Sequence, residues 1–374
     1  MHRRLLLLLA LIVAMTGSAR TEAEIQIGFA NPLSGPYALS GHRNQVAVET
    51  AVYDLNRRGG VLDEQVQLVT VDDACGLEQA LVAARELVTA GVRFVVGHLC
   101  SHSSLLGAGV YETAAILMIS PDSTHSRLTE EGRGNVFRLI GRDDGQGQMA
   151  ADLLAERWAE KKIAILHDGT TYGEGLAVEA RKRLRQHGVS EALYDAYVPG
   201  VKDYSALIDR LQNAGIEILY LGGYGREAGL ILRTARERGD RLQLVGGDGL
   251  GMDGFWAEAG AAGDGTIFSA RPEVRGTAET ADVLTRFQRR GLGARQGGIG
   301  AYAAIQAWAQ AVERAGTVEM AAVAAMLRRG RFETVLGPVA FDSKGDLRDP
   351  AWQWKVWTNA DHVPLSLGER KLAW

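Results

Sequence analysis

The sequence predicts an α/β protein made of two Rossmann-like lobes, each with a parallel sheet covered by helices. Short apolar runs typical of buried strands alternate with amphipathic helical segments from residue 25 to Gly141. The same alternation starts again after Gly141 and continues to residue 245. Alternating strands and helices put helices on both faces of a parallel sheet, so each half predicts one lobe. The length of 374 residues is sufficient for two such domains.

The N-terminus has the three parts of a secretory signal peptide. Met1–Arg4 is basic, Leu5–Met15 is apolar, and Gly17–Ala19 is a small-residue cleavage site. The apolar run is too short to span a bilayer, which disfavours a membrane anchor. No cysteine lies near the cleavage site to carry a lipid. We therefore predict a signal peptide over residues 1–23, with cleavage after Ala19 or Ala23, and a soluble periplasmic mature protein.

Charge and cysteine content narrow the range of functions. The chain has 41 basic and 45 acidic residues, and loss of Arg3 and Arg4 leaves 39 against 45, a net charge of −6. An acidic protein is a poor candidate for binding nucleic acid or an anionic membrane. The cysteines Cys75 and Cys100 each follow a predicted strand, and in an oxidising compartment they predict one disulfide. Free or metal-binding thiols are the weaker alternative, because no CxxC pattern and no nearby pair of histidines completes a ligand set.

The first lobe begins with a strand and an amphipathic helix. This helix has apolar residues at i, i+3, i+4 and i+7, namely Val48, Ala51, Val52 and Leu55, and ends at Gly59-Gly60. A second helix begins at Leu77 and ends at Gly91. The strands are predicted over 25–29, 66–71, 94–97 and 115–119. The last two strands end in hydroxyl-rich turns.

The second lobe repeats this order, and the last third of the chain is less regular. Its strands are predicted over 163–166, 193–198, 218–221 and 242–245, and its helices over 148–158, 175–186, 204–213 and 226–238. A strand over 266–270 and helices over 280–290, 301–314 and 318–329 follow. Residues 339–341 and 352–357 are predicted as two strands joined through a turn at Gly345. The alternating tryptophans of 352–357 predict a strand that covers a lobe.

Polar residues follow the predicted strands of both lobes, at the edge where open α/β sheets bind ligands. A free α-amino acid needs N–H and O–H donors for its carboxylate and an acidic side chain for its ammonium group. Helix N-termini at these turns add backbone N–H groups that bind anions. The candidate residues are Ser101, Thr124, Tyr172, Tyr224 and Asp248.

Three other motifs suggest chemistry that their surroundings do not support. Ser101 and His102 are adjacent in a turn, without a GxSxG elbow or an orienting carboxylate, which disfavours a hydrolase. His167-Asp168 has no second ligand pair for a metal. Gly222–Gly225 lacks the GxGxxG spacing of a dinucleotide loop. We expect no catalytic residues, no metal and no cofactor.

Several segments also carry a family resemblance. They are Ser34–Pro36, Asp72–Cys75, Gly97–Ser101, Ile116–Pro121, Tyr172–Gly175, Gly222–Tyr224 and Gly337-Pro338. In these segments the chain resembles the leucine/isoleucine/valine-binding proteins, the periplasmic receptors of branched-chain amino-acid ABC transporters. The resemblance implies a type I periplasmic-binding fold whose lobes are joined by a three-crossover hinge. It implies that lobe one comprises 24–141 plus 271–346 and lobe two 142–270 plus 347–374.

The resemblance also assigns roles to residues. It places the family's disulfide on Cys75 and Cys100 and the ligand carboxylate on Ser101, the N–H of Thr124 and the hydroxyl of Tyr224. It places the ammonium group on the Thr124 hydroxyl, the carbonyl of Asp122 and the acid at Asp248, where the family has a glutamate. Tyr172 matches a tyrosine of the closing lobe.

The side-chain pocket departs from the family pattern. Ser40 stands where the family has a tryptophan, and Gly297 lies where it has an aromatic residue. The candidates for this pocket are Tyr37, Ser40, Leu99 and Gly297. Losing two aromatic walls enlarges and hydrates the pocket and weakens leucine binding, unless Tyr37 or another group fills the space. We expect the amino-acid head group to be retained and the side-chain preference to be altered or broadened.

Asp122 is a further departure, because it replaces a small residue. Its carboxylate would repel the ligand carboxylate unless it turned to solvent or paired with a group such as His125. The expected function is a non-enzymatic, monomeric periplasmic receptor that binds a free amino acid, branched-chain or related, and delivers it to the permease of an ABC transporter. The alternatives are a sensory or regulatory protein of the same fold for an amide or other small carboxylate and, less favoured, a secreted hydrolase using Ser101.

Overall fold

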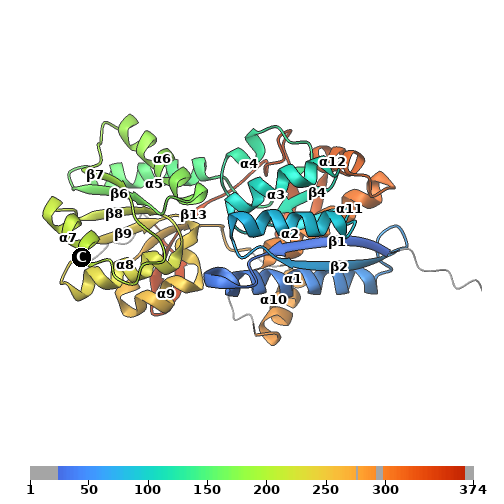
Figure 1. The fold of residues 1–374 in the computed structure, drawn as a ribbon, viewed down its shortest axis with the longest axis horizontal. Helices are drawn as coiled ribbons and strands as arrows, with labels where there is room; N and C mark the ends of the chain where they lie inside the picture. The colour runs from blue at the N-terminus through green and yellow to red at the C-terminus, as the bar shows by residue number, and fades with distance from the viewer. Residues whose placement is uncertain (1–23, 275–276, 292–297, 367–374) are drawn as a thin grey trace, which may run out of the picture.

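The computed structural model describes residues 24–274, 277–291 and 298–366. Two sheets lie side by side, each covered by helices on both faces, which confirms the predicted α/β class with two lobes (Figure 1). The predicted signal peptide, residues 1–23, lies outside the described residues. Within the described ranges, no helix is both long and apolar enough to cross a membrane.

The first sheet has five parallel strands in the order β2-β1-β3-β4-β5. These strands are β1 (Glu24–Asn31), β2 (Gln65–Asp72), β3 (Phe94–Gly97), β4 (Leu117–Ser120) and β5 (Val136–Arg138). The helices around it are α1 (Ala38–Arg57), α2 (Leu77–Thr89), α3 (Ser101–Thr113), α4 (Arg127–Glu130), α10 (Ala278–Arg289), α11 (Ile299–Ala315) and α12 (Met320–Arg329). Successive strand residues point to opposite faces, so Phe94 and Val96 pack against α1 and α11 whereas Val95 packs against α2 and α3.

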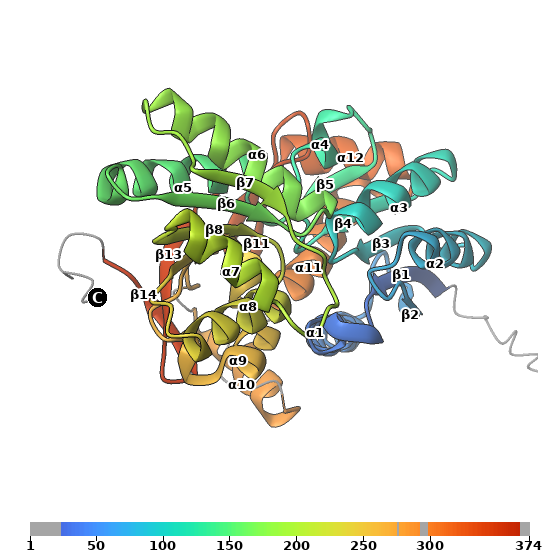
Figure 2. The ribbon, with the colours of Figure 1, turned by 60° about the vertical axis from the view of Figure 1, so that its left-hand side comes forward.

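The second sheet has seven strands in the order β14-β13-β10-β9-β8-β6-β7. They are β6 (Ile163–His167), β7 (Leu193–Ala196), β8 (Ile218–Gly222), β9 (Gln243–Gly246), β10 (Ile267–Ala270), β13 (Gln353–Thr358) and β14 (Asp361–Pro364). Strands β6 to β10 are parallel, and β13 and β14 extend the sheet in antiparallel fashion (Figure 2). The helices α5 (Asp143–Trp158) and α6 (Thr171–Gln186) cover one face; α7 (Ser205–Ala214), α8 (Gly225–Glu237) and α9 (Asp253–Ala259) cover the other.

The predicted pairing of 339–341 with 352–357 through a Gly345 turn is wrong. Strand β12 (Gly337–Ala340) pairs with β11 (Arg331–Thr334) in a separate two-stranded sheet, and β13 pairs with β10 and β14. The chain passes from one lobe to the other between β12 and β13. Gly345 instead packs against β5: its carbonyl accepts a hydrogen bond from the Arg138 N–H at 3.0 Å. With φ at 100° and the Val136 oxygen 2.1 Å from where a Cβ would lie, the position requires glycine.

Three segments connect the lobes, after β5, after β10 and after β12, and they pack against one another. Arg271 donates from Nη2 to the Leu139 carbonyl at 2.8 Å, and Gln353 donates to the Arg271 carbonyl at 3.2 Å. A Cβ on Gly141 would lie 2.5 Å from Trp352 Nε1, so glycine allows the first segment to contact the third. These contacts confirm the three-crossover hinge.

Candidate functional site

A cavity of about 270 Å³ lies between the lobes, at the carboxyl ends of their strands. Both lobes contribute polar residues to its wall. Those predicted from the sequence are Ser40, Ser101, Asp122, Thr124, Tyr172, Tyr224 and Asp248, together with the apolar Leu99. A volume of this size suits a small molecule rather than a polymer.

Ser101 is the first residue of α3 and is 2% exposed. Helix N-termini leave backbone N–H groups without intrahelical acceptors, so an anion is stabilised at this point of the wall. The Ser101 hydroxyl oxygen accepts a hydrogen bond from the His125 N–H at 3.3 Å. Nε2 of His102 lies 2.7 Å from the carbonyl oxygen of Cys75. The adjacent histidine is therefore turned to the backbone of another loop, which does not fit a serine nucleophile with His102 as its base.

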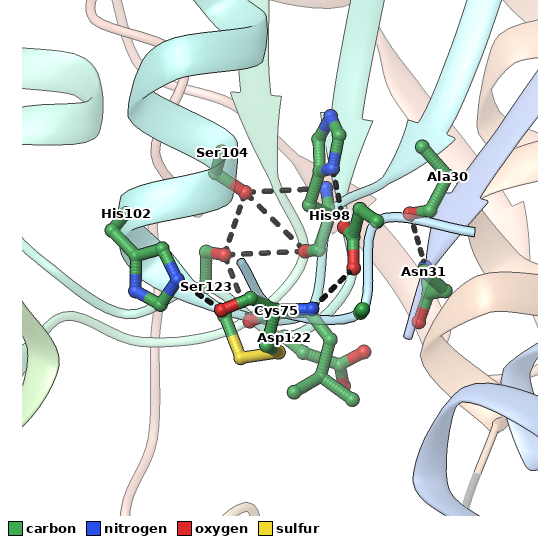
Figure 3. Close-up of a disulfide and its surroundings, with 12 residues drawn as sticks. Ala30, Asn31, Cys75, His98, His102, Ser104, Asp122 and Ser123 are labelled. Atoms are coloured by element: carbon green, nitrogen blue, oxygen red, sulfur yellow. Dashed lines mark hydrogen bonds and ion pairs between the residues drawn. A yellow bond between two sulfur atoms is a disulfide. The ribbon is translucent and has the colours of Figure 1, made fainter. Parts of the chain in front are cut away.

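The disulfide between Cys75 and Cys100 holds the start of α3, and its prediction is confirmed (Figure 3). The two Cα atoms are 5.6 Å apart. Ala74 and Cys75 both have left-handed backbone conformations, with φ of 45° and 51°. Two carboxylates support this turn, because Asp72 accepts from the Ala74 N–H at 2.8 Å and Asp73 from the Cys75 N–H at 2.9 Å. Ser101 follows directly after a covalently anchored residue.

Three serine hydroxyls converge on the His98 carbonyl oxygen behind this wall, and Figure 3 shows two of them, Ser104 and Ser123. Ser104, Ser120 and Ser123 donate to it at 3.3, 2.9 and 3.2 Å. All four residues are buried. This shared acceptor ties the loop after β4 to the loop after β3, which carry two of the three predicted carboxylate contacts, Thr124 and Ser101.

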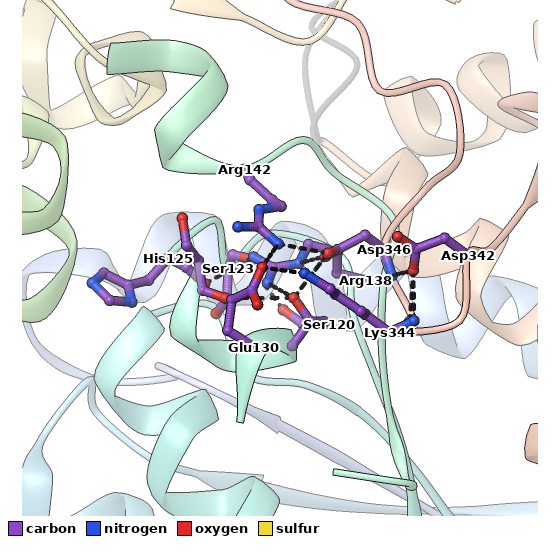
Figure 4. A network of polar contacts seen from close by, with 12 residues as sticks. Ser120, Ser123, His125, Glu130, Arg138, Arg142, Asp342, Lys344 and Asp346 are labelled. Atoms are coloured by element: carbon purple, nitrogen blue, oxygen red, sulfur yellow. Dashed lines mark hydrogen bonds and ion pairs between the residues drawn. The ribbon is translucent and has the colours of Figure 1, made fainter. Parts of the chain in front are cut away.

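Arg138, which is fully buried, fixes the backbone around Thr124 (Figure 4). Its Nη1 donates to the carbonyls of Ser123 at 3.2 Å and His125 at 3.0 Å, the two neighbours of Thr124. Its Nε lies 2.6 Å from a carboxylate oxygen of Asp346. A guanidinium with a buried carboxylate partner thus sets the direction in which the loop presents Thr124.

Asp248 follows β9 and is held from two sides. Its Oδ1 accepts hydrogen bonds from the Tyr172 hydroxyl at 2.7 Å and from Gln146 Nε2 at 3.0 Å. The Asp248 N–H donates to Gln146 Oε1 at 3.1 Å, which fixes the orientation of that amide. Burial raises the pKa of Asp248, and the two hydrogen bonds to its carboxylate oppose this shift. A cation entering the cavity would favour the ionised form.

A second buried acid, Asp143, lies beside Asp248. It is 1% exposed, and burial together with the negative charge of Asp248 raises its pKa well above the ordinary value. Its Oδ1 accepts a hydrogen bond from Gln146 Nε2 at 3.2 Å, and a hydrogen bond from the Thr124 side chain opposes the rise of its pKa. Asp143 was not predictable from the sequence, because nothing in the pattern of α5 distinguishes it from a capping acid. No cluster of three potential metal ligands occurs in residues 24–274, 277–291 and 298–366.

The structure describes three of the four residues predicted for the side-chain pocket, Tyr37, Ser40 and Leu99. Ser40 and Leu99 line the cavity, whereas Tyr37 lies behind it, with its ring centroid 4.6 Å from that of Tyr224. Tyr224 in turn packs against Tyr172, at 5.0 Å between centroids. Tyr37 therefore supports the wall instead of refilling the space beside Ser40. Gly297 lies outside the described residues.

The suggested partner of Asp122 is wrong. Its Oδ2 accepts a hydrogen bond from Nδ2 of Asn44 at 2.6 Å. His125 is occupied elsewhere, because its Nδ1 accepts from the Arg127 N–H at 3.2 Å. Asn44 lies one helical turn after Ser40 on α1, so the Asp122 carboxylate faces the region of the predicted side-chain pocket.

The cavity wall also contains two charged residues that were not among the sequence predictions, Arg271 and Arg43. Arg271 follows β10, so the rule that identified Asp248 at the end of β9 would have found it. Arg43, on α1 of the first lobe, forms an ion pair with Asp253 of the second lobe at 2.8 Å. The only feature of the sequence that could have indicated Arg43 is its place on α1, three residues after Ser40. This ion pair joins the lobes at the cavity and indicates that the structure is a closed form.

Two lobes, a hinge of three segments and a polar cavity at their interface define a receptor that encloses a small molecule. The family model described as periplasmic binding protein matches residues 24–353, and the chain belongs to this family. The Leu/Ile/Val-binding protein homolog 1 of Brucella suis is 37% identical over 350 residues, 93% of this chain and 94% of that protein. The leucine-, isoleucine-, valine-, threonine- and alanine-binding protein of Pseudomonas aeruginosa is 37% identical, covering 87% of both. A leucine-binding protein of Thermotoga maritima shares the fold, with a TM-score of 0.82, 22% identity and coverage of 91% of this chain and 98% of that one.

Proposed function

We propose that the protein is a periplasmic receptor for a free α-amino acid, branched-chain or related, which it encloses between its lobes and delivers to the permease of an ABC transporter. The observation that carries this proposal is the meeting, in one cavity, of an anion site from one lobe and a carboxylate from the other. The names of the relatives at 37% identity support the ligand class. Non-enzymatic action agrees with the orientation of His102 away from Ser101.

The ligand carboxylate is assigned to the first turn of α3 and to Thr124. Ser101 supplies a hydroxyl and helix N–H groups, the Thr124 backbone supplies a further N–H, and Tyr224 adds its hydroxyl from the second lobe. The ammonium group is assigned to Asp248, with the Thr124 hydroxyl and the Asp122 carbonyl as neutral acceptors. Tyr172 acts through Asp248, to which it donates at 2.7 Å.

The lobe boundaries belong to the same proposal: residues 24–141 plus 271–346 form the first lobe and 142–270 plus 347–374 the second. We further propose that the mature protein is a soluble monomer, released by removal of a signal peptide within residues 1–23. Closure brings Asp248 and Tyr224 to the ligand, so affinity depends on the closed form.

Calorimetry of the refolded, ligand-free protein against the twenty amino acids tests the proposal. We expect one ligand per chain, and loss of binding when the amine of the best ligand is replaced by hydroxyl or its carboxylate is esterified. Such analogues lose only one half of the head group, so they separate recognition of the ammonium from recognition of the carboxylate. The absence of binding by any α-amino acid would refute the assignment.

A further inference from the structure

The Asp122 carboxylate presents an unused acceptor to the cavity. Its Oδ2 accepts from Asn44 at 2.6 Å, and Nδ2 of Asn44 also donates to Asn31 at 2.9 Å. Asn44 and Asn31 are both buried, so this chain of amides fixes the carboxylate from behind. Within the part of the chain that the structure describes, no hydrogen bond reaches Asp122 Oδ1. A half-buried acceptor on a ligand-sized cavity is available to a ligand donor.

Arg271 lines the same cavity. Its Nη2 donates to the carbonyls of Pro121 and Leu139, at 2.9 and 2.8 Å, which ties the guanidinium to the residue preceding Asp122. No hydrogen bond among the described residues uses its Nη1 or Nε. A Cβ on Gly300 would lie 2.8 Å from Nη1, so the glycine leaves room for the guanidinium at the wall. The charge of Arg271 acts on both Asp122 and Asp248.

We infer that the side-chain compartment of this cavity selects an amino acid with a side-chain carboxamide, its NH₂ donating to Asp122 Oδ1 and its C=O accepting from Arg271. The inference rests on the proposed function, because it assumes that the head group lies at Ser101, Thr124 and Asp248. The compartment lies beside Ser40 and Asn44, which both line the cavity.

Other side chains match this wall less well. A carboxylate would pair with Arg271 but would meet the negative charge of Asp122, and an ammonium group would pair with Asp122 but would meet Arg271. An aliphatic side chain would leave Asp122 Oδ1 and the remaining N–H groups of Arg271 without a partner once water is excluded, and unpaired buried polar groups are costly. A carboxamide has one donor group and one acceptor group on neighbouring atoms, so it satisfies both partners without adding charge.

Asparagine and leucine form a matched pair for the test, because they differ little in shape but a carboxamide replaces a branched alkyl group. Titration calorimetry of the wild-type protein should show tighter binding of asparagine or glutamine than of leucine, glutamate or lysine. A hydrogen bond to a charged group accounts for a preference of about 10- to 100-fold. Leucine binding more tightly than both amides would overturn the inference.

The substitution Asp122→Ala should reverse this order. It removes the acceptor and enlarges the apolar surface, so amide affinity should fall about 10-fold or more while leucine affinity rises. Ser101→Ala is the matched control, because it weakens the head-group site and should lower all affinities by the same factor. An unchanged ratio of amide to leucine affinity in Asp122→Ala would also overturn the inference.

Thermal denaturation establishes whether Asp122→Ala is folded. If Asp122→Ala does not fold, Arg271→Lys provides the second test. Lysine keeps the positive charge but lacks the fork of N–H donors, so the affinity for the amides should fall more than the affinity for leucine. An unchanged ratio in that variant would count against the inference in the same way. Failure of the proposed function has a different result, since no amino acid would then bind at all.

Discussion

The substitution Asp248→Asn tests the centre of the proposed site. Asparagine keeps the shape of the side chain and an oxygen that can accept hydrogen bonds from Tyr172 and Gln146. In the wild type these two donors lie 2.7 and 3.0 Å from Asp248 Oδ1. What it removes is the charge that is proposed to face the ligand ammonium. Removing one partner of a buried charge pair costs about 2–5 kcal/mol, equivalent to a loss of roughly 30- to 4,000-fold in affinity. Because asparagine keeps a neutral acceptor, we expect the lower part of this range, about 100-fold.

The sign of the pH dependence provides an independent check. Burial raises the pKa of Asp248, so the protonated form persists to a higher pH than for an ordinary aspartate. Protonated Asp248 cannot pair with an ammonium group, so wild-type affinity should fall as the pH is lowered through this raised pKa. The Asp248→Asn protein should show no such fall.

Folding should respond in the opposite direction. A carboxyl group whose pKa is higher in the folded than in the unfolded state lowers the free energy of unfolding as the pH rises between the two values. Asp248→Asn removes this cost, so the ligand-free variant should be at least as stable as the wild type at neutral pH. Calorimetric titration from pH 4 to 8, with thermal denaturation of the same samples, measures both effects. An intact variant that binds the best amino acid within threefold of the wild type would refute the role of Asp248.

Three further predictions concern the surrounding structure. Replacing Cys75 and Cys100 by serine removes a cross-link over a separation of 25 residues, which should lower the free energy of unfolding by about 3.5 kcal/mol in denaturant titrations; an equally stable variant would contradict this estimate. Asp143→Asn should raise the free energy of unfolding at neutral pH and make that free energy decline less as the pH rises, because burial raises the pKa of Asp143 well above the ordinary value. A variant that is less stable than the wild type at neutral pH would contradict this prediction. Arg43→Ala should speed ligand release about fivefold in stopped-flow fluorescence, because it removes an ion pair between the lobes. Exchanging the charges of Arg43 and Asp253 should restore slow release. Equal release rates in the wild type and both variants would contradict this prediction.

The parts of the fold with strong local patterns were predictable from the sequence. The run at 94–97 forms β3, because continuous apolar residues suit a strand that is buried on both faces. The run at 25–29 forms β1, where the alternating Ile25, Ile27 and Phe29 pack into one core cluster. Strand β5 was missed, since it has only three residues and one of them is the buried Arg138. The pairing of β13 was misassigned, because a period of two identifies a strand but does not identify its neighbour in the sheet.

The candidate site was predictable where a residue follows a strand of a parallel sheet. That rule placed Ser101, Thr124, Tyr224 and Asp248 at one cavity, because all carboxyl ends of a parallel sheet lie at the same edge. The partner of Asp122 was not predictable in this way. Asn44 lies 78 positions away on a helix, and only the packing of α1 against the sheet brings the two together.

The charges around the cavity explain why the ligand and the closed form should stabilise each other. Burial raises the pKa values of Asp122 and Asp248 and lowers that of Arg271, so each of these groups is costly to keep ionised in the closed, empty cavity. A zwitterionic ligand with a polar side chain supplies partners for these groups, and it reduces the cost only when both lobes reach it. Closure without a ligand would leave the costs in place. A receptor that closes fully only around its ligand can present a distinct loaded surface to a membrane partner, and on the proposed function the buried charges would supply that coupling.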